Sequence, residues 1–124
     1  MGNFKGVVIK ESLGNTEILK RIKILSTKIE QVTPSHKTPW LKQWTLHTVE
    51  IPSESMDRIS DELKNSLEKK HNWFMHFWKE GLLVVIFKDK IFKLPKDDKE
   101  AWRPAIEHGI SLGIPKYQLN FPTD

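Results

Sequence analysis

The stretch WFMHFWKEGLLVVIFKDKIFKL, residues 73–94, decides the fold of this chain. It contains three short apolar runs, separated by turn residues around Gly81 and Asp89. Short runs joined by tight turns predict an antiparallel meander. Because side chains alternate along a strand, the first run is apolar on both sides. One side carries Trp73, Met75 and Phe77, and the other side carries Phe74, His76 and Trp78.

A sheet that is apolar on both sides has to be covered twice. The chain offers two good helices, and if both pack on one side, the other side keeps an aromatic surface that is large for a monomer. We therefore expect the N-terminal strands to form a second layer, or a partner such as a second copy of the chain to cover that side.

The residues before the meander predict a central helix. Pro52–Ser55 is typical of a helix start, with Ser53 or Ser55 as the capping residue. An apolar stripe at helical spacing follows, formed by Met56, Ile59, Leu63 and Leu67. We expect the basic residues 69–71 in the last turn, where cations are favoured, and Asn72 in a left-handed exit from the helix.

The residues after the meander predict a C-terminal helix. Asp97, with Glu100 three residues later, matches a capping box. Pro104 then has to lie in the first turn or kink the helix. Gly113, followed by an apolar residue and a proline, predicts a left-handed stop. We expect the tail, residues 116–124, to be extended.

The N-terminal half predicts further strands. Residues 4–13 are rich in β-branched side chains and end at a Gly-Asn turn, which indicates a first strand. Residues 18–32 fit both helical and strand spacing, and we predict a helical turn near 16–21 followed by a strand near 23–33. Residues 40–51 predict another strand, whose change of apolar parity indicates a bulge or coverage on both faces. Together these patterns predict an α+β fold in which an antiparallel sheet of about five or six strands carries two main helices, one central and one C-terminal.

Composition restricts the class of protein. A length of 124 residues and a mass of 14.5 kDa fit a single domain, residues 1–124. The absence of cysteine excludes disulfides, thiolate nucleophiles and cysteine-ligated zinc. The longest uncharged apolar run, residues 81–87, is far shorter than the roughly 20 residues of a membrane-spanning helix. We expect a cytoplasmic protein that does not enter membranes and has no metal or cofactor.

Positive charge is concentrated in one part of the chain. The net charge is +4, but residues 18–49 hold six basic residues against the single acid Glu30. The six are Lys20, Arg21, Lys23, Lys28, Lys37 and Lys42. Such a region attracts anionic ligands, nucleic acid included. Alternatively, these lysines protect an exposed strand edge against aggregation.

Aromatic and histidine side chains indicate where a ligand could bind. Trp40 and Trp44 lie in the same basic segment, and aromatics interleaved with basic groups suit the stacking of bases and the neutralisation of phosphates. They are also typical of a sheet core. His47 and His76 alternate with apolar neighbours, which is typical of core or rim residues, although in a cleft they would suit proton transfer. The ligand-binding candidates are Lys37, Trp40, Lys42, Trp44, His47, His76 and Trp78.

Two segments resemble a known group of proteins. PWLKQWTLHTVE, residues 39–50, and SLGIPKYQLNF, residues 111–121, resemble segments of small prokaryotic proteins that have no assigned activity. The resemblance covers most of the chain. It implies a single cytoplasmic domain and contributes no catalytic residues.

No phosphate-binding loop, dinucleotide fingerprint or nucleophile elbow is present in the sequence. We therefore favour a non-enzymatic binding module with a groove between strands 40–47 and 73–78. Its expected ligand is anionic or aromatic, with nucleic acid as one candidate. A first alternative is an acid–base enzyme that uses His47 or His76 with a carboxylate such as Glu50. A second alternative is a homodimeric structural or regulatory protein whose apolar sheet face is the interface.

Overall fold

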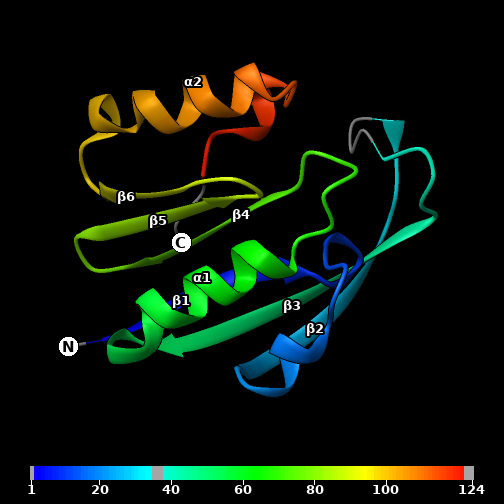
Figure 1. The fold of residues 1–124 in the computed structure, drawn as a ribbon, viewed down its shortest axis with the longest axis horizontal. Coiled ribbons are helices and arrows are strands. Elements are labelled where there is room, and N and C mark those ends of the chain that lie inside the picture. Colours follow the sequence, from blue (N-terminus) through cyan, green and yellow to red (C-terminus); the bar gives the residue numbers. More distant parts are fainter. Residues whose placement is uncertain (1, 35–37, 122–124) are drawn as a thin grey trace.

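The protein forms one six-stranded antiparallel sheet with two α-helices, which confirms the predicted α+β fold (Figure 1). The computed structural model describes residues 2–34 and 38–121. The strand order is β2-β3-β1-β4-β5-β6. The strands are β1 (Asn3–Ile9), β2 (Lys23–Gln31), β3 (Gln43–Pro52), β4 (Phe74–Lys79), β5 (Leu82–Phe87) and β6 (Ile91–Pro95).

The sheet consists of an N-terminal half and the predicted meander, joined at a short seam. β1 pairs with β3 along its whole length, but it pairs with β4 only at Lys5–Trp78 and Gly6–Phe77. The seam is tight, because a Cβ atom on Gly6 would lie 2.3 Å from Cδ1 of Phe77 and 2.5 Å from the backbone oxygen of His76. Glycine is therefore the residue that allows the two halves to meet.

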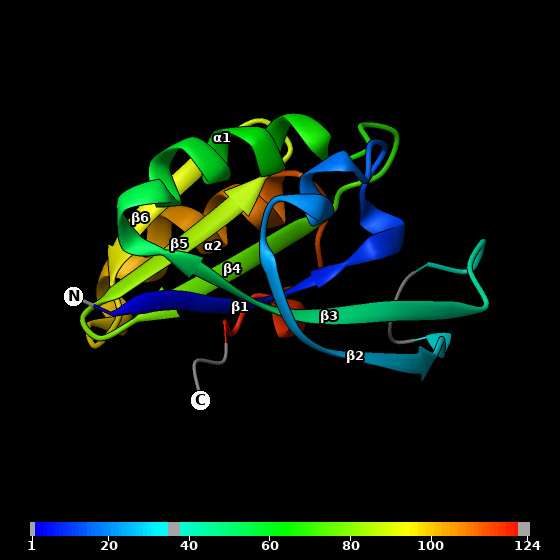
Figure 2. The same ribbon diagram turned by 90° about the horizontal axis from the view of Figure 1, so that it is seen from below.

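The two helices cover opposite faces of the sheet (Figures 1 and 2). The first face is covered by α1 (Met56–Ser66), whose predicted stripe is buried against residues of the N-terminal strands and the meander. The second face is covered over the meander by α2 (Arg103–Ser111). Core residues under α1 include Phe4, Val8, Val49, Ile51, Phe77 and Ile86, and those under α2 include Leu83, Val85, Phe87, Leu94 and Leu119.

This arrangement corrects the expected coverage of the meander. The N-terminal strands do not form a second layer, because they extend the same sheet beyond β4. Both sides of the meander are covered by one helix each, so its aromatic side chains do not require a partner. Three exposed large apolar residues, Ile24, Leu25 and Ile29, lie instead on the edge strand β2.

The N-terminal predictions hold with changed boundaries. The first strand ends at Ile9 and continues into the 3₁₀ turn η1 (Lys10–Ser12). There the Glu11 carboxylate accepts hydrogen bonds from the backbone N–H of Thr45 (2.7 Å) and from its hydroxyl (2.8 Å). These side-chain bonds to β3 follow the last backbone pair of β1 with β3, Ile9–Leu46. The predicted helical turn is η2 (Glu17–Lys20), and a strand follows it as expected.

The bulge is not in β3 but in β2, between Ile24 and Ser26. The other predicted cause of the parity change, coverage of β3 on both faces, stays a prediction. Val49 is buried in the cluster under α1, and Trp44 packs against the same cluster through its contact with Trp73. The edge strand β2 also carries Lys23 and Lys28, as the edge-protection interpretation requires.

Several predicted helix ends are wrong. Neither Ser53 nor Ser55 caps α1 in the described chain; the hydroxyl of Ser53 donates to the backbone oxygen of Gly2, and a 3₁₀ turn, η4 (Ser53–Ser55), precedes the helix. The helix ends at Ser66, so residues 69–71 lie in a loop and not in its last turn. Asn72 does not adopt a positive φ, which among described non-glycine residues occurs at Phe121.

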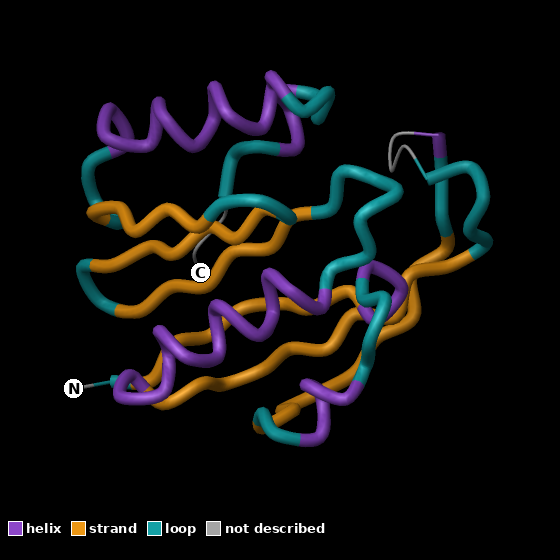
Figure 3. The backbone as a smooth tube through the Cα atoms, in the orientation of Figure 1, coloured by secondary structure: helices purple, strands orange, loops and turns teal. Residues whose placement is uncertain are grey.

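At the C-terminal helix, the predicted stop is confirmed and the predicted cap is not. A 3₁₀ turn, η5 (Lys99–Trp102), precedes α2 without a side-chain cap, and Pro104 lies in the first turn as required. Gly113 has a φ of +96°, and the Ile114 N–H donates to the Gly109 carbonyl at 3.0 Å. The tail forms the 3₁₀ turn η6 (Lys116–Gln118) where an extended chain was expected (Figure 3), and residues 122–124 lie outside the described part.

Candidate functional site

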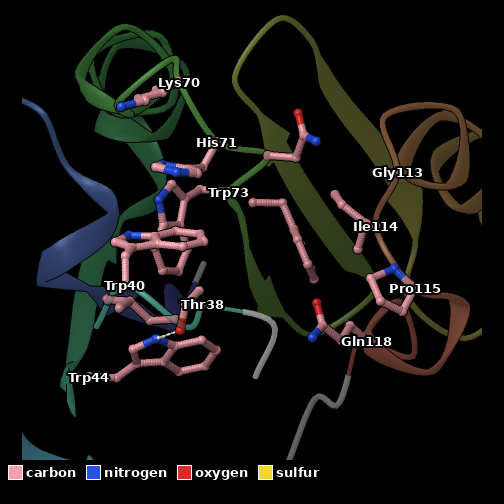
Figure 4. A pocket seen from close by; sticks show the side chains of 13 residues that line it. Thr38, Trp40, Trp44, Lys70, His71, Trp73, Gly113, Ile114, Pro115 and Gln118 are labelled. Atoms are coloured by element: carbon pink, nitrogen blue, oxygen red, sulfur yellow. Dashed lines mark hydrogen bonds between the residues drawn. The ribbon is translucent and has the colours of Figure 1, made fainter. Parts of the chain in front are cut away.

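A pocket of about 570 Å³ lies beyond the seam, where the pairing of β1 with β4 has stopped (Figure 4). Three segments form it: the chain leading into β3, the loop between α1 and β4, and the residues that follow α2. Figure 4 shows the rings of Trp40 and His71 on one wall and Ile114 and Pro115 on the opposite wall. The pocket therefore has an aromatic wall and an apolar wall.

The aromatic wall is held together by ring contacts. Trp40 and His71 stack with centroids 3.7 Å apart and an interplanar angle of 13°. Trp73 makes edge contacts with Trp40, at 6.5 Å between centroids, and with Trp44, at 5.7 Å. Trp73 and Trp40 differ in the exposed fraction of their side chains, which is 6% for Trp73 and 47% for Trp40. Trp73 is a core residue, whereas Trp40 presents aromatic surface to whatever enters the pocket.

Glu68 organises the loop between α1 and β4. Its Oε2 accepts hydrogen bonds from Nδ1 of His71 at 2.5 Å and from Nε1 of Trp73 at 2.8 Å, while its Oε1 accepts the Lys70 backbone N–H at 2.9 Å. One carboxylate thus orients two of the rings that form the aromatic wall. On the other side of this wall, Nε1 of Trp44 donates to the buried hydroxyl of Thr38 at 3.0 Å.

The hydrogen bonds of Glu68 change its acidity. Partial burial raises the pKa of the Glu68 carboxyl, but the hydrogen bonds from His71, Trp73 and the Lys70 N–H outweigh burial, and the pKa lies below its usual value of 4.5. A carboxyl with a lowered pKa in the folded state stabilises the fold above the unfolded value. This contribution is lost as the pH falls through the folded pKa.

We therefore expect acidification below about pH 4.5 to destabilise the wild type more steeply than Glu68→Gln, which has no carboxyl to protonate at this position. Urea unfolding at a series of pH values between 3 and 7 measures the difference. Glu80→Gln, at the exposed turn between β4 and β5, is the matched control and should keep the wild-type slope. Parallel slopes for wild type and Glu68→Gln would show that these hydrogen bonds do not stabilise the fold.

Among the predicted ligand-binding residues that the structure describes, Trp40 and Trp44 are the two that line the pocket. Lys42 is exposed and does not line it, and Lys37 lies outside the described residues. β1 lies between β3 and β4, so the predicted groove does not run along strands 40–47 and 73–78, but one end of each segment, at Trp44 and Trp73, lines the pocket. His47 pairs with the Thr27 hydroxyl at 2.8 Å, and His76 stacks on Trp78 with centroids 5.5 Å apart.

The predicted acid–base pairing of His47 with Glu50 does not form. His47 and Glu50 lie on opposite faces of β3, and Glu50 pairs with Lys23 at 3.7 Å. Two histidine–carboxylate pairs form elsewhere, at His71–Glu68 and His108–Asp89. In the second pair, the hydrogen bond from His108 holds the pKa of the Asp89 carboxyl below its usual range against partial burial, but this pair lies outside the pocket.

His71 and Trp73 line the pocket and Glu68 orients them from outside it, but none of the three was among the predicted ligand-binding residues. They form the pattern Glu-x-x-His-x-Trp, in which Glu68 and His71 were assigned to the end of an expected helix and Trp73 to an expected strand. The sequence feature that could have indicated a site is the pair of rings, His71 and Trp73, within five residues of the Glu68 carboxylate at a helix-to-strand junction. The residues that follow α2, 113–118, carried no signal of their own for a pocket.

The fold and the pocket together define a small α+β protein with a pocket that has one aromatic wall. No family model, curated protein or solved structure matches this chain. Residues 2–34 and 38–121 contain no group of three or more potential metal ligands. They also contain no helix with the length and apolar character needed to cross a membrane.

Proposed function

We propose that this protein is a non-enzymatic binding module that takes a small planar aromatic ligand into the pocket behind Trp40. The observation that carries the proposal is the half-exposed Trp40 ring, which stacks on His71 and faces a pocket whose opposite wall contains Ile114 and Pro115. Aromatic side chains bind flat rings through large contact areas and favourable ring geometry.

The size and the polar groups of the pocket support this ligand class. A volume of about 570 Å³ lies within the range of roughly 300–1,000 Å³ that small-molecule pockets occupy. Among its lining residues, Lys70 and His71 are the ones that can carry positive charge. An aromatic ring with an anionic or polar substituent therefore fits better than a purely apolar ring.

Nucleic acid is a less favoured ligand. Single strands bind along a groove with a series of stacking platforms and basic side chains. The basic segment offers fewer free charges than its composition indicates, because Lys20, Arg21 and Lys23 pair with Glu17, Glu62 and Glu50. Retention of a single-stranded oligonucleotide at low salt that depends on Lys28 and Lys42, and not on Trp40, would favour nucleic acid over a single ring.

We expect Trp40→Ala to weaken the binding of planar rings by about 5-fold to 150-fold, because loss of one aromatic contact costs roughly 1–3 kcal/mol. The measurement is an NMR titration of the tryptophan indole N–H signals with adenine, 4-hydroxybenzoate and 4-cyanophenol. Signals of Trp40, Trp44 and Trp73 should shift. The signal of Trp102, which is buried and donates to the Pro95 carbonyl at 2.9 Å, is the internal reference.

The control variant is Leu82→Ala, which removes a side chain of similar exposure at the far end of the β4–β5 hairpin. It should bind the probes as the wild type does. The proposal fails if no probe shifts the three pocket signals at millimolar concentration, or if Trp40→Ala binds the probes as tightly as Leu82→Ala does.

A further inference from the structure

We propose that the Glu68–His71 pair makes the pocket selective for rings that carry a weakly acidic N–H or O–H group. This inference rests on the proposed function, because it names the class of ring that the same pocket takes. The group that makes the selection is Nε2 of His71. Glu68 determines that this nitrogen is a hydrogen-bond acceptor, because it binds the other ring nitrogen, Nδ1.

The first step concerns the tautomer of His71. An ionised carboxylate only accepts hydrogen bonds, so Nδ1 of His71, 2.5 Å from Oε2 of Glu68, carries a proton. In the neutral ring the other nitrogen, Nε2, is then a hydrogen-bond acceptor. Within the described chain, Nε2 has no hydrogen-bond partner.

The second step concerns the position of the ring. His71 lines the pocket and its side chain is 29% exposed, while stacking on Trp40 fixes its plane (Figure 4). The Glu68 carboxylate also holds Trp73, which is buried in the core, so the histidine is anchored to a part of the molecule that does not move easily. The imidazole is therefore a preorganised polar group beside the aromatic surface of Trp40.

The third step concerns the proton of the ligand. A ring that keeps its N–H or O–H donates that hydrogen to Nε2. A more acidic ring transfers the proton to Nε2, and the complex then holds a ligand anion beside an imidazolium ring that Glu68 stabilises. The number of protons in the complex is the same in both cases. Lys70, the other ionisable residue lining the pocket, favours the anion as well.

A ring without such a group leaves Nε2 away from water and without a partner. An acceptor that the bound ring shields from water and leaves unsatisfied lowers affinity, and we expect the difference to be about tenfold or more. Selection therefore comes from the penalty on rings that lack the acidic hydrogen.

The experiment compares two probes that differ in one proton, 4-cyanophenol and its methyl ether, 4-cyanoanisole. Indole N–H titrations of the wild type should give at least tenfold tighter binding of the phenol. His71→Phe keeps a flat ring against Trp40 but removes Nε2, so the two probes should bind that variant with nearly equal affinity. The extra size of the methyl group is the same for both proteins, so a change in the ratio reports on Nε2.

A second measurement needs only the wild type. The ¹⁵N chemical shift of Nε2 in His71 should move on addition of the phenol and stay in place on addition of the methyl ether. If neither probe binds, the proposed function itself fails. If both bind the wild type equally, or if the preference for the phenol persists in His71→Phe, the pocket binds rings but the Glu68–His71 pair does not select them.

Discussion

Gly6→Ala is expected to lower the free energy of unfolding by roughly 3 kcal/mol, because the added methyl group has no space at the seam of the sheet. Its Cβ would lie 2.3 Å from a ring carbon of Phe77 and 2.5 Å from the backbone oxygen of His76. A side chain can rotate away, but a backbone carbonyl of the neighbouring strand moves only if the strand moves. The two halves of the described sheet are joined at the pairs Lys5–Trp78 and Gly6–Phe77. A shift of either strand therefore weakens the contact between the two halves.

The measurement is urea unfolding followed by tryptophan fluorescence. Gly2→Ala is the matched control, since a Cβ there meets nothing within 4 Å. The double variant Gly6→Ala with Phe77→Leu should not recover the loss, because the contact with the His76 oxygen remains. A Gly6→Ala protein as stable as Gly2→Ala would mean that β1 and β4 do not meet as closely as described.

Trp73→Ala is expected to cost about 3–5 kcal/mol of stability, the usual loss when a large buried aromatic side chain is removed. The side chain is 6% exposed and supports both Trp40 and Trp44. Its removal also takes one of the donors away from Glu68. The pocket should lose its aromatic wall together with the stability, so ring probes should no longer bind.

Trp73→Phe separates the two contributions of this residue. It keeps an aromatic ring but not the N–H that donates to Glu68, so it should lose about 1.5–3 kcal/mol, the usual range for a hydrogen bond to a charged group. Trp40→Ala is the exposed comparison and should have a much smaller effect on unfolding. If Trp73→Ala unfolds at the same urea concentration as Trp40→Ala, Trp73 does not link the core to the pocket.

Local and periodic patterns in the sequence predicted most of the elements. The meander, the stripe of α1 and the stop at Gly113 depend on alternation, on helical spacing and on the conformational freedom of one glycine, all of which act between residues close in the chain. The predicted serine cap of α1 was wrong because a capping bond is not determined by the local sequence alone. A serine at a helix start can bond elsewhere, and Ser53 donates to Gly2, far away in sequence.

The candidate site was predicted only in part. Trp40 and Trp44 were selected because they lie among basic residues, and both line the pocket. His76 and Trp78 were expected to face them across a groove, but β1 occupies that place in the sheet. Strand alternation indicates which face a side chain occupies and not which strand lies beside it.

The sequence by itself determined that this chain folds as an α+β sheet protein with apolar residues on both sides of a meander. Only the tertiary structure decided that the two helices cover opposite faces, that β1 enters between β3 and β4, and that Glu68 links His71 to Trp73. The physical reason is the distance over which each interaction acts. Periodicity is a property of neighbouring residues, whereas strand order and the pocket arise from contacts between segments far apart in the chain.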